Sequence, residues 1–156
     1  MVRVKGLMLK NVPTLKKEAK IEDAVKLLAE TQIGCIVVTD NEAPIGIVSE
    51  IDVVKKVISK GKSLKESIRG IMSSPLSFMS PNMRLDAALE IIDSKKFRRY
   101  PVVENDKLVG LVNKKDVINS VSFRFKLHRS IQIIVLIIFV LFEFFVFLYY
   151  GRSSKT

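Results

Sequence analysis

The sequence predicts a mixed fold (α/β or α+β) in which two β-α-β-β-α repeats pack as one globule, followed by a C-terminal transmembrane-like helix. Three observations predict this fold. The chain repeats itself at an offset of 64 residues over most of its length before residue 122. Within each copy, apolar patterns of helical spacing alternate with short strand-like runs. After the second copy, an almost uninterrupted apolar run covers residues 131–150.

The repeat is clearest around one stretch of seven residues. Gly46–Asp52 reads Gly-Ile-Val-Ser-Glu-Ile-Asp, and residues 110–116 read Gly-Leu-Val-Asn-Lys-Lys-Asp. The same offset places Val38 on Val102 without a gap. Self-similarity at a fixed period indicates a repeated structural unit. Units of about 60 residues bury little core alone, so we expect the two copies to pack on each other.

The first repeat covers residues 6–61. Apolar residues at helical spacing predict helices, β-branched runs predict buried strands, and Gly61 stands where it can end the last helix. The expected elements are a lead-in strand or short helix over Met1–Lys10, an extended segment over Val12–Leu15, a helix over Ile21–Glu30, a hairpin of strands Cys35–Thr39 and Ile45–Val48, and a helix over Glu50–Lys60.

A linker helix is expected over 62–69, because Ser63 and Glu66 have the spacing of a capping box. The second repeat, 70–122, then follows the order of the first. Its expected elements are a short strand over Leu76–Met79, a helix carrying the stripe Leu85, Ala88, Leu89 and Ile92, a strand running into Val102-Val103, its hairpin partner Leu108–Val112, and a helix that begins near Val117.

The repeated stretch has two interpretations. A strand that turns directly into a helix exposes the first backbone N–H groups of the helix, which attract anions such as phosphate. Ser49 adds a hydroxyl at this turn, and Asp52 adds a carboxylate that can accept hydrogen bonds from a ribose diol. Ser-x-x-Asp is also a variant of the capping box and can close the helix end by itself.

The order of helix stripe, Val-Val strand, turn and Gly-h-h-[Ser/Thr/Asn]-x-x-Asp resembles the cystathionine-β-synthase (CBS) domain. The two copies together resemble a tandem CBS pair, or Bateman module, over about residues 6–121. The resemblance implies a regulatory module with two clefts between the copies. Such clefts bind adenine nucleotides or adenosyl compounds, so AMP, ADP, ATP and S-adenosylmethionine are all candidate ligands.

The resemblance also implies the residues of the binding site. The motif hydroxyl contacts phosphate or ribose, and the motif aspartate holds the ribose hydroxyls; Asn113 replaces the hydroxyl residue in the second copy. The strand entrances line the clefts in the family. The nucleotide-binding residues carried over are Ser49, Asp52, Asn113, Asp116, Gly34, Cys35, Ile36, Arg98, Arg99 and Tyr100.

Three of these residues have a second interpretation. Arg98 and Arg99 can hold phosphate by forked hydrogen bonds, or they can form a solvated basic edge. Cys35 is expected to be a small buried residue rather than a reactive thiol.

Composition limits the function classes. One cysteine and one histidine allow no internal disulfide, no cysteine-based metal cluster and no complete set of nucleophile, base and orienting group, so we expect a binding module rather than an enzyme. The formal charge of +10 leaves nucleic-acid binding as an alternative, although the basic clusters are short. The family resemblance further implies a homodimer through Ile21–Glu30, Glu50–Lys60 and their repeats.

The C-terminal segment predicts a membrane anchor. Sixteen of the twenty residues in 131–150 are Ile, Leu, Val or Phe, and at about −0.3 to −0.6 kcal/mol each they outweigh a cost of about 3 kcal/mol for Glu143. Tyr149 and Tyr150 stand where an interfacial aromatic belt is expected. The alternative is a helix buried in an oligomer interface of a soluble protein.

The flanking charges give the anchor a weak orientation. The basic juxtamembrane segment 123–130 carries three basic residues, and two follow the span. Because nucleotides are cytoplasmic, we expect a single-pass membrane protein with its repeats in the cytoplasm. Glu143 is then a candidate contact with a partner helix, and the chain can be the sensor subunit of a larger membrane transporter complex.

Overall fold

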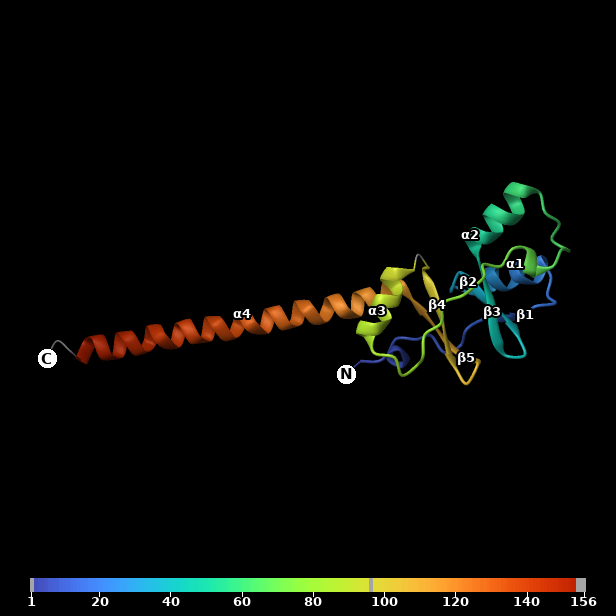
Figure 1. Ribbon diagram of the computed structural model, residues 1–156. Coiled ribbons are helices and arrows are strands. Elements are labelled where there is room, and N and C mark those ends of the chain that lie inside the picture. Colours follow the sequence, from blue (N-terminus) through green and yellow to red (C-terminus); the bar gives the residue numbers. More distant parts are fainter. Residues whose placement is uncertain (1, 96, 154–156) are drawn as a thin grey trace. The chain divides into compact units, whose positions relative to one another are not determined.

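The computed structural model describes the backbone of residues 2–95 and 97–153, and the side chains of 2–95, 97–121 and 130–146 (Figure 1). The chain divides into two units, residues 1–117 and residues 118–156. Both repeats belong to the first unit, apart from the last residues of the second.

The first repeat forms a three-stranded sheet with one long helix. Its elements are β1 (Thr14–Lys16), α1 (Ile21–Glu30), β2 (Cys35–Asp40) and β3 (Ala43–Ser49). The strand order is β1-β2-β3, with β1 parallel to β2 and β2 antiparallel to β3. The predicted helix Ile21–Glu30 and the predicted hairpin are confirmed.

The helical segment 50–60 is confirmed, but it is not a regular α-helix. It begins as α2 (Glu50–Asp52), widens into the π turn η2 (Val53–Val57) and ends as the 3₁₀ turn η3 (Ile58–Lys60). The N–H of Ile58 is shared between the carbonyls of Val53 and Val54. Gly61 ends the segment in the left-handed conformation, with φ of 61°, as its position predicted.

The predicted linker helix over 62–69 is wrong. The described chain has only the 3₁₀ turn η4 (Ile68–Gly70) in this region. Glu66 does accept from the N–H of Ser63 at 2.9 Å, but the carbonyls of Leu64 and Glu66 accept from the N–H groups of Glu22 and Ile21. The carbonyls of the linker therefore accept from the free N–H groups at the N-terminus of α1, instead of from N–H groups within a linker helix.

The second repeat contains α3 (Leu85–Ser94), β4 (Arg99–Glu104), β5 (Lys107–Asn113) and the start of α4 (Lys114–Ser153). β4 and β5 form a two-stranded antiparallel sheet. The predicted strand Leu76–Met79 is reduced to one parallel bridge between Met79 and Val102. Pro101 of β4 has no N–H to donate to this stretch, whereas Val37 at the matching position of the first repeat donates to Pro13, so the pairing is limited to one residue.

The segments that lead into the two repeats are exchanged between them. Residues 3–9, which include the 3₁₀ turn η1 (Val4–Gly6), lie at the start of the first repeat but bridge to the second at Leu9–Leu111. Residues 67–73 lie at the start of the second repeat but bridge to the first at Ile47–Ser73, at positions 64 residues away from the first pair. We call 3–9 and 67–73 the crossing segments. Neither repeat is complete without the crossing segment from the other side.

The buried residues agree with this exchange. One core cluster joins α1 to the first sheet and includes Ile68 and Ile71 of the second crossing segment, both fully buried. A second cluster contains Cys35, Val37 and Ile47 of the first repeat and Leu111 of the second. The prediction that the two copies pack as one globule is therefore confirmed.

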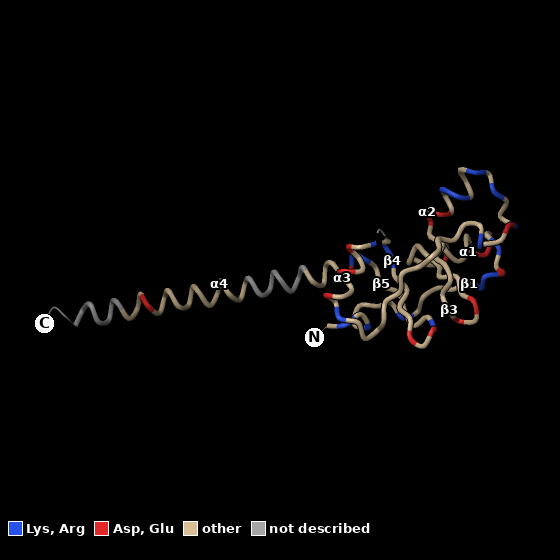
Figure 2. The backbone as a smooth tube through the Cα atoms, viewed as in Figure 1, with Lys and Arg blue, Asp and Glu red and all other residues tan. Residues whose placement is uncertain are grey.

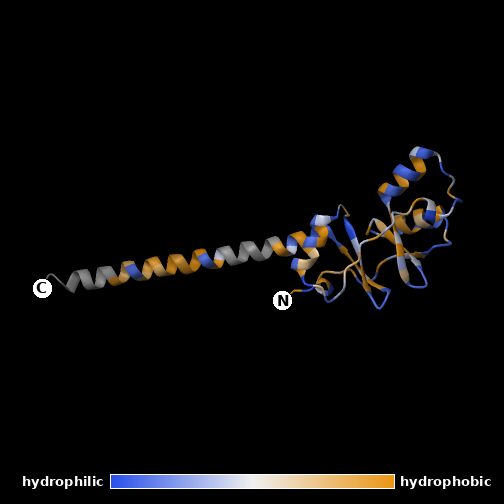
Figure 3. Ribbon diagram, viewed as in Figure 1, coloured by the Kyte–Doolittle hydropathy of each residue, from blue (hydrophilic) through white to orange (hydrophobic). Residues whose placement is uncertain are grey.

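The second unit consists of the continuation of α4. Its described side chains between Ile131 and Phe145 are almost all apolar (Figure 3). The large apolar side chains among them are 50–67% exposed. Among the residues that the structure describes, no helix is long and apolar enough to cross a membrane.

The predicted transmembrane helix over 131–150 is therefore not confirmed. The side chains of 147–150, which include Tyr149 and Tyr150, and those of most of the basic segment 123–130 lie outside the described residues.

Two glycines allow the crossing segments to approach the sheets. A Cβ atom built on Gly46 would lie 2.5 Å from Sδ of Met72, and one on Gly110 would lie 2.9 Å from the carbonyl oxygen of Leu9. Methionine can move, but the Leu9 carbonyl accepts from the N–H of Leu111 and cannot move without breaking that bridge. Gly110 is therefore the position at which a methyl group is least tolerated.

We predict that Gly110→Ala lowers the free energy of unfolding by about 1–3 kcal/mol through overpacking. Gly6→Ala is the matched control, because its added Cβ would lie at an ordinary 3.8 Å from Val2. Chemical denaturation of both variants measures the effect. Equal stability of Gly110→Ala and Gly6→Ala would show that the crossing segment does not pack closely on β5.

Candidate functional site

A pocket of about 320 Å³ lies where β3 turns into α2. Its wall is built from three parts of the chain: the β3–α2 turn, the stretch that follows the second crossing segment, and the entrance of β4. Four of the predicted site residues lie together here. The lining residues are Ile47, Ser49, Ile51, Asp52, Lys55, Ser73, Leu76, Ser77, Phe97, Arg98 and Arg99.

The turn at Ser49 forms a complete capping box. Ser49 is extended, and its N–H donates to Oδ2 of Asp52 at 2.9 Å. In return, the Asp52 N–H donates to Oγ of Ser49 at 3.4 Å, and the Ser49 hydroxyl donates to the same carboxylate oxygen at 2.6 Å. The capping interpretation of Ser-x-x-Asp is confirmed, and it leaves both side chains in the pocket wall.

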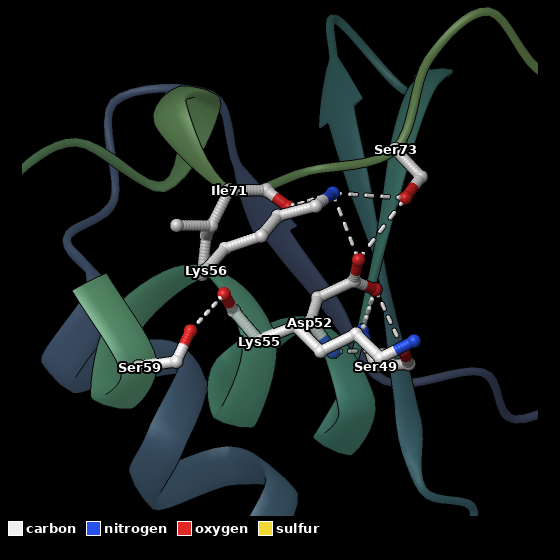
Figure 4. A network of polar contacts seen from close by, with 7 residues as sticks. All are labelled: Ser49, Asp52, Lys55, Lys56, Ser59, Ile71 and Ser73. Carbon is white, nitrogen blue, oxygen red and sulfur yellow. Dashed lines mark hydrogen bonds and ion pairs between the residues drawn. The ribbon is translucent and has the colours of Figure 1, made fainter.

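Lys56 and Ser73 hold the other oxygen of Asp52 (Figure 4). The ammonium of Lys56 lies 2.8 Å from Oδ1 of Asp52 and also donates to the carbonyl of Ile71 at 2.8 Å and to Oγ of Ser73 at 3.1 Å. The Ser73 hydroxyl donates to Oδ1 of Asp52 at 3.2 Å. The network therefore ties the start of α2 to the second crossing segment.

The network keeps Asp52 ionised. Burial disfavours the charged carboxylate, but the hydrogen bonds from Lys56 and Ser49 and the positive charge of Lys56 outweigh that cost. Together they hold the pKa of Asp52 below its ordinary value. At neutral pH the pocket thus contains a fixed negative acceptor, which suits the hydroxyl groups of a sugar.

The rest of the polar wall is basic. Lys55, Arg98 and Arg99 line the pocket, and Figure 2 shows that basic residues continue beyond α2. Nη2 of Arg99 donates to the carbonyl of Ile33 at 3.0 Å, whereas its buried Nε has no hydrogen-bond partner among the described residues. A buried donor without a partner is costly.

The remaining predicted site residues do not line this pocket. Asn113 donates to Asp116 at 2.9 Å in the second copy of the motif. Gly34 has a positive φ of 65° and lies against Arg99 and Glu50. The predictions that Gly34 lines a cleft and that Asn113 and Asp116 form the site of the second copy stay predictions.

Three of the predicted cleft residues are core residues instead. Ile36 belongs to the core of the first repeat, and Tyr100 is fully buried, with its hydroxyl donating to the carbonyl of Phe97 at 3.2 Å. Cys35 is fully buried between the sheets, as expected, and burial raises the pKa of its thiol. Both faces of these strands are covered, so these three side chains pack in the core, and their predicted part in nucleotide binding stays a prediction.

The sequence analysis missed several residues of the site. Lys56 stands four residues after Asp52 on the same helical segment. This spacing favours an ion pair, so the contact between Lys56 and Asp52 could have been predicted from the sequence. Ser73, Leu76 and Ser77 reach the pocket only because 67–73 crosses to the first repeat. No local pattern marks such a long-range contact.

Comparison with known proteins supports a family assignment. The family profile described as CBS domain matches residues 4–59 and 68–122. An uncharacterised protein of Methanopyrus kandleri is 36% identical over 103 residues, which are 65% of this chain and 53% of that protein. This chain therefore spans about half the length of that relative.

Two solved structures are informative neighbours. The structure of CBSX2 in complex with AMP is 26% identical, has a TM-score of 0.64, and is matched over 78% of this chain and 97% of that one. The hexameric CBS-CP12 protein from bloom-forming cyanobacteria is 28% identical, with a TM-score of 0.66, over 75% of this chain and 70% of that one.

Proposed function

Because this chain belongs to the CBS domain family and carries two copies of the domain in tandem, we propose that it is a regulatory module that binds an adenine nucleotide in the pocket at Ser49 and Asp52. The candidate ligands are AMP, ADP, ATP and S-adenosylmethionine. The signal passes to a partner and no reaction is catalysed by the chain itself.

One observation carries this proposal. A single ionised carboxylate, Asp52, shares a pocket wall with the cations of Lys55, Arg98 and Arg99. The carboxylate suits a ribose diol and the cations suit phosphate, so the wall matches the two polar parts of a nucleotide. The pocket is also lined by apolar Ile47, Ile51 and Leu76, which offer a surface on which a base can pack. The similar CBSX2 chain has been solved with AMP, which supports this ligand class.

We predict that the full chain in mild detergent binds at least one of the four candidate ligands with a Kd of about micromolar order in calorimetry. Asp52→Ala removes the acceptor and weakens binding at least about tenfold, while the lost cap costs about 1 kcal/mol of stability. Asp23→Ala is the matched control, because Asp23 caps α1 in the same way and does not line this pocket. Failure of all four ligands, or an unchanged titration of folded Asp52→Ala, would refute the proposal.

Nucleic-acid binding is the alternative function, suggested by the net charge of +10. Salt separates the two functions. Contacts with a phosphate backbone release counterions, so such binding weakens by orders of magnitude between 50 and 200 mM salt. A nucleotide held by one carboxylate and a few cations in a pocket depends on salt much less.

A second copy of this chain is a proposed partner. Ile51, Val54 and Ile58 lie on one face of the 50–60 segment and are 48%, 55% and 70% exposed. The large apolar residues of α1, in contrast, face the core. A symmetric pair can bury the same stripe from both copies, and the similar CBS-CP12 protein is hexameric. We propose a homodimer through the 50–60 segment.

We predict that Ile58→Glu converts a dimer into a monomer in analytical ultracentrifugation at micromolar concentration, because a charge would enter the apolar stripe. Lys60→Glu on the same segment is the control and leaves the dimer intact. A wild-type chain that sediments as a monomer throughout this range would count against the homodimer.

Membrane attachment through 131–150 is proposed from the sequence, with the repeats on the cytoplasmic side. Thirteen large apolar side chains between 131 and 145 are at least half exposed in the isolated chain. A patch of this kind is unfavourable in water and calls for a lipid or protein cover. Glu143 within it would face a partner protein, such as another subunit of a membrane complex.

Fractionation of cells tests the attachment. We predict that full-length protein stays with membranes after a carbonate wash and that Val140→Lys releases it, because a mid-segment lysine opposes insertion by about 3 kcal/mol. Wild-type protein found in the soluble fraction without detergent would contradict the attachment and favour burial of the segment in an oligomer.

A further inference from the structure

The carboxylate of Asp52 has no free acceptor position in the described structure. An ionised carboxylate offers about four lone-pair sites. Oδ2 accepts from the N–H and the hydroxyl of Ser49, and Oδ1 accepts from Lys56 and Ser73. A ribose hydroxyl can therefore bind only by replacing one of these donors.

The four donors differ in how easily they can be replaced. The Ser49 N–H belongs to the helix cap, and the Lys56 ammonium uses its three donors on Asp52, the Ile71 carbonyl and Ser73. The Ser73 hydroxyl makes the longest of the bonds from side chains to the carboxylate, at 3.2 Å, and lies in the pocket wall. Lys56 is not among the residues that line the pocket. Lys56 therefore contacts the Asp52 carboxylate from outside the pocket. The Ser73 hydroxyl, in contrast, uses the acceptor site on Oδ1 that a ligand hydroxyl would need.

Lys56 also fixes the second crossing segment. Its bonds to Ile71 and Ser73 lie beside the antiparallel bridge in which Ser73 donates to Ile47 at 2.8 Å and Ile47 donates to Ser73 at 3.1 Å. The second copy lacks this arrangement, because the offset of 64 places Ser120 on Lys56 and Leu9 on Ser73. The device belongs to the first motif and is not a general feature of the repeat.

We propose that Lys56 is a positioning residue that locks the Asp52 carboxylate and the crossing segment 67–73 into one unit, so that nucleotide binds well only while this segment is docked on β3. The part of this inference that concerns nucleotide rests on the proposed function. The lock itself is a property of the nucleotide-free chain and can be tested separately.

Other charges near Asp52 cannot replace Lys56. Lys55 lies on the same helical segment, and Arg98 and Arg99 reach the pocket from the entrance of β4, but no bond from these three to Asp52 is present in the described structure. Glu50 lies on the other side of the turn, against Gly34. Removal of the Lys56 charge therefore leaves Asp52 with the bonds from Ser49 and Ser73 only.

The first experiment uses the nucleotide-free full chain in mild detergent. Carboxyl carbon NMR follows the titration of Asp52 from pH 7 downward, and hydrogen exchange follows the amides of Ile47 and Ser73. In Lys56→Met we expect the Asp52 midpoint to rise, because the opposite charge beside it is lost, and both amides to exchange at least about tenfold faster. Lys56→Arg restores part of both effects, and the exposed control Lys60→Met changes neither.

The second experiment measures the affinity for the best ligand of the panel between pH 4 and pH 8. We expect Lys56→Met to bind about tenfold more weakly at pH 7 and to lose affinity at a higher pH than wild type. We also expect nucleotide to slow exchange of the Ile47 and Ser73 amides in wild type and much less in Lys56→Met.

The outcomes separate the two ideas. If no ligand binds wild type but Lys56→Met shifts the Asp52 titration and the two amides, the proposed function fails and the lock stands. If folded Lys56→Met keeps the wild-type Asp52 midpoint and amide exchange, the lock is refuted, whatever binds. If the lock is present but affinity is equal in both proteins, the positioning role is refuted. A misfolded Lys56→Met is replaced by Ser73→Ala, for which faster exchange of both amides is again required.

Discussion

The exchange of crossing segments between the repeats is the constraint on which the rest of the structure depends. A single repeat offers a small sheet and one long helix, too little apolar surface for a stable core. Residues 67–73 bring Ile68 and Ile71 into the core of the first repeat, and residues 3–9 add a bridge to β5. The glycines in the middle of β3 and β5 leave space for this approach. The exchange also brings Ser73 and the stretch after it to the Ser49 turn, so the same contacts that complete the core build the pocket.

The chemistry of the pocket follows from how Asp52 is held. A capping carboxylate is commonplace at a helix start and contributes about 1 kcal/mol. Here the same group is half-buried and paired with Lys56, and its pKa is lowered, so it stays a charged acceptor within a basic wall. Stability and the proposed binding thus use one carboxylate. Because the carboxylate has both roles, a ligand bound in the pocket can affect the crossing segment 67–73. This segment connects the two repeats and can therefore transmit a signal between them.

Much of the fold could be predicted from local pattern. The stripe of α1, the hairpin β2–β3 and the end of the 50–60 segment at Gly61 follow from spacing and turn chemistry, and the offset of 64 predicts their copies. The predictions that failed concern positions whose structure depends on residues far away in the sequence. The linker from 62 to 69 has a capping signal, yet its carbonyls accept hydrogen bonds from the first N–H groups of α1. Tyr100 and Ile36 stand at cleft entrances in the sequence but are covered on both sides. Ser73 meets Asp52 only through the exchange, which no local window contains, whereas the i,i+4 spacing of Asp52 and Lys56 can be seen in the sequence.

Native-state hydrogen exchange of the full chain tests most directly whether the two repeats form one cooperative unit. The amides of β2–β3 and β4–β5 are followed in wild type and in Gly110→Ala, whose added methyl group disturbs only the second sheet and the crossing segment on it. The predicted result is an equal loss of protection in both hairpins, because each repeat depends on the other for its core. Protection of β2–β3 that stays at the wild-type level while β4–β5 loosens would contradict the exchange as the basis of the fold and of the pocket.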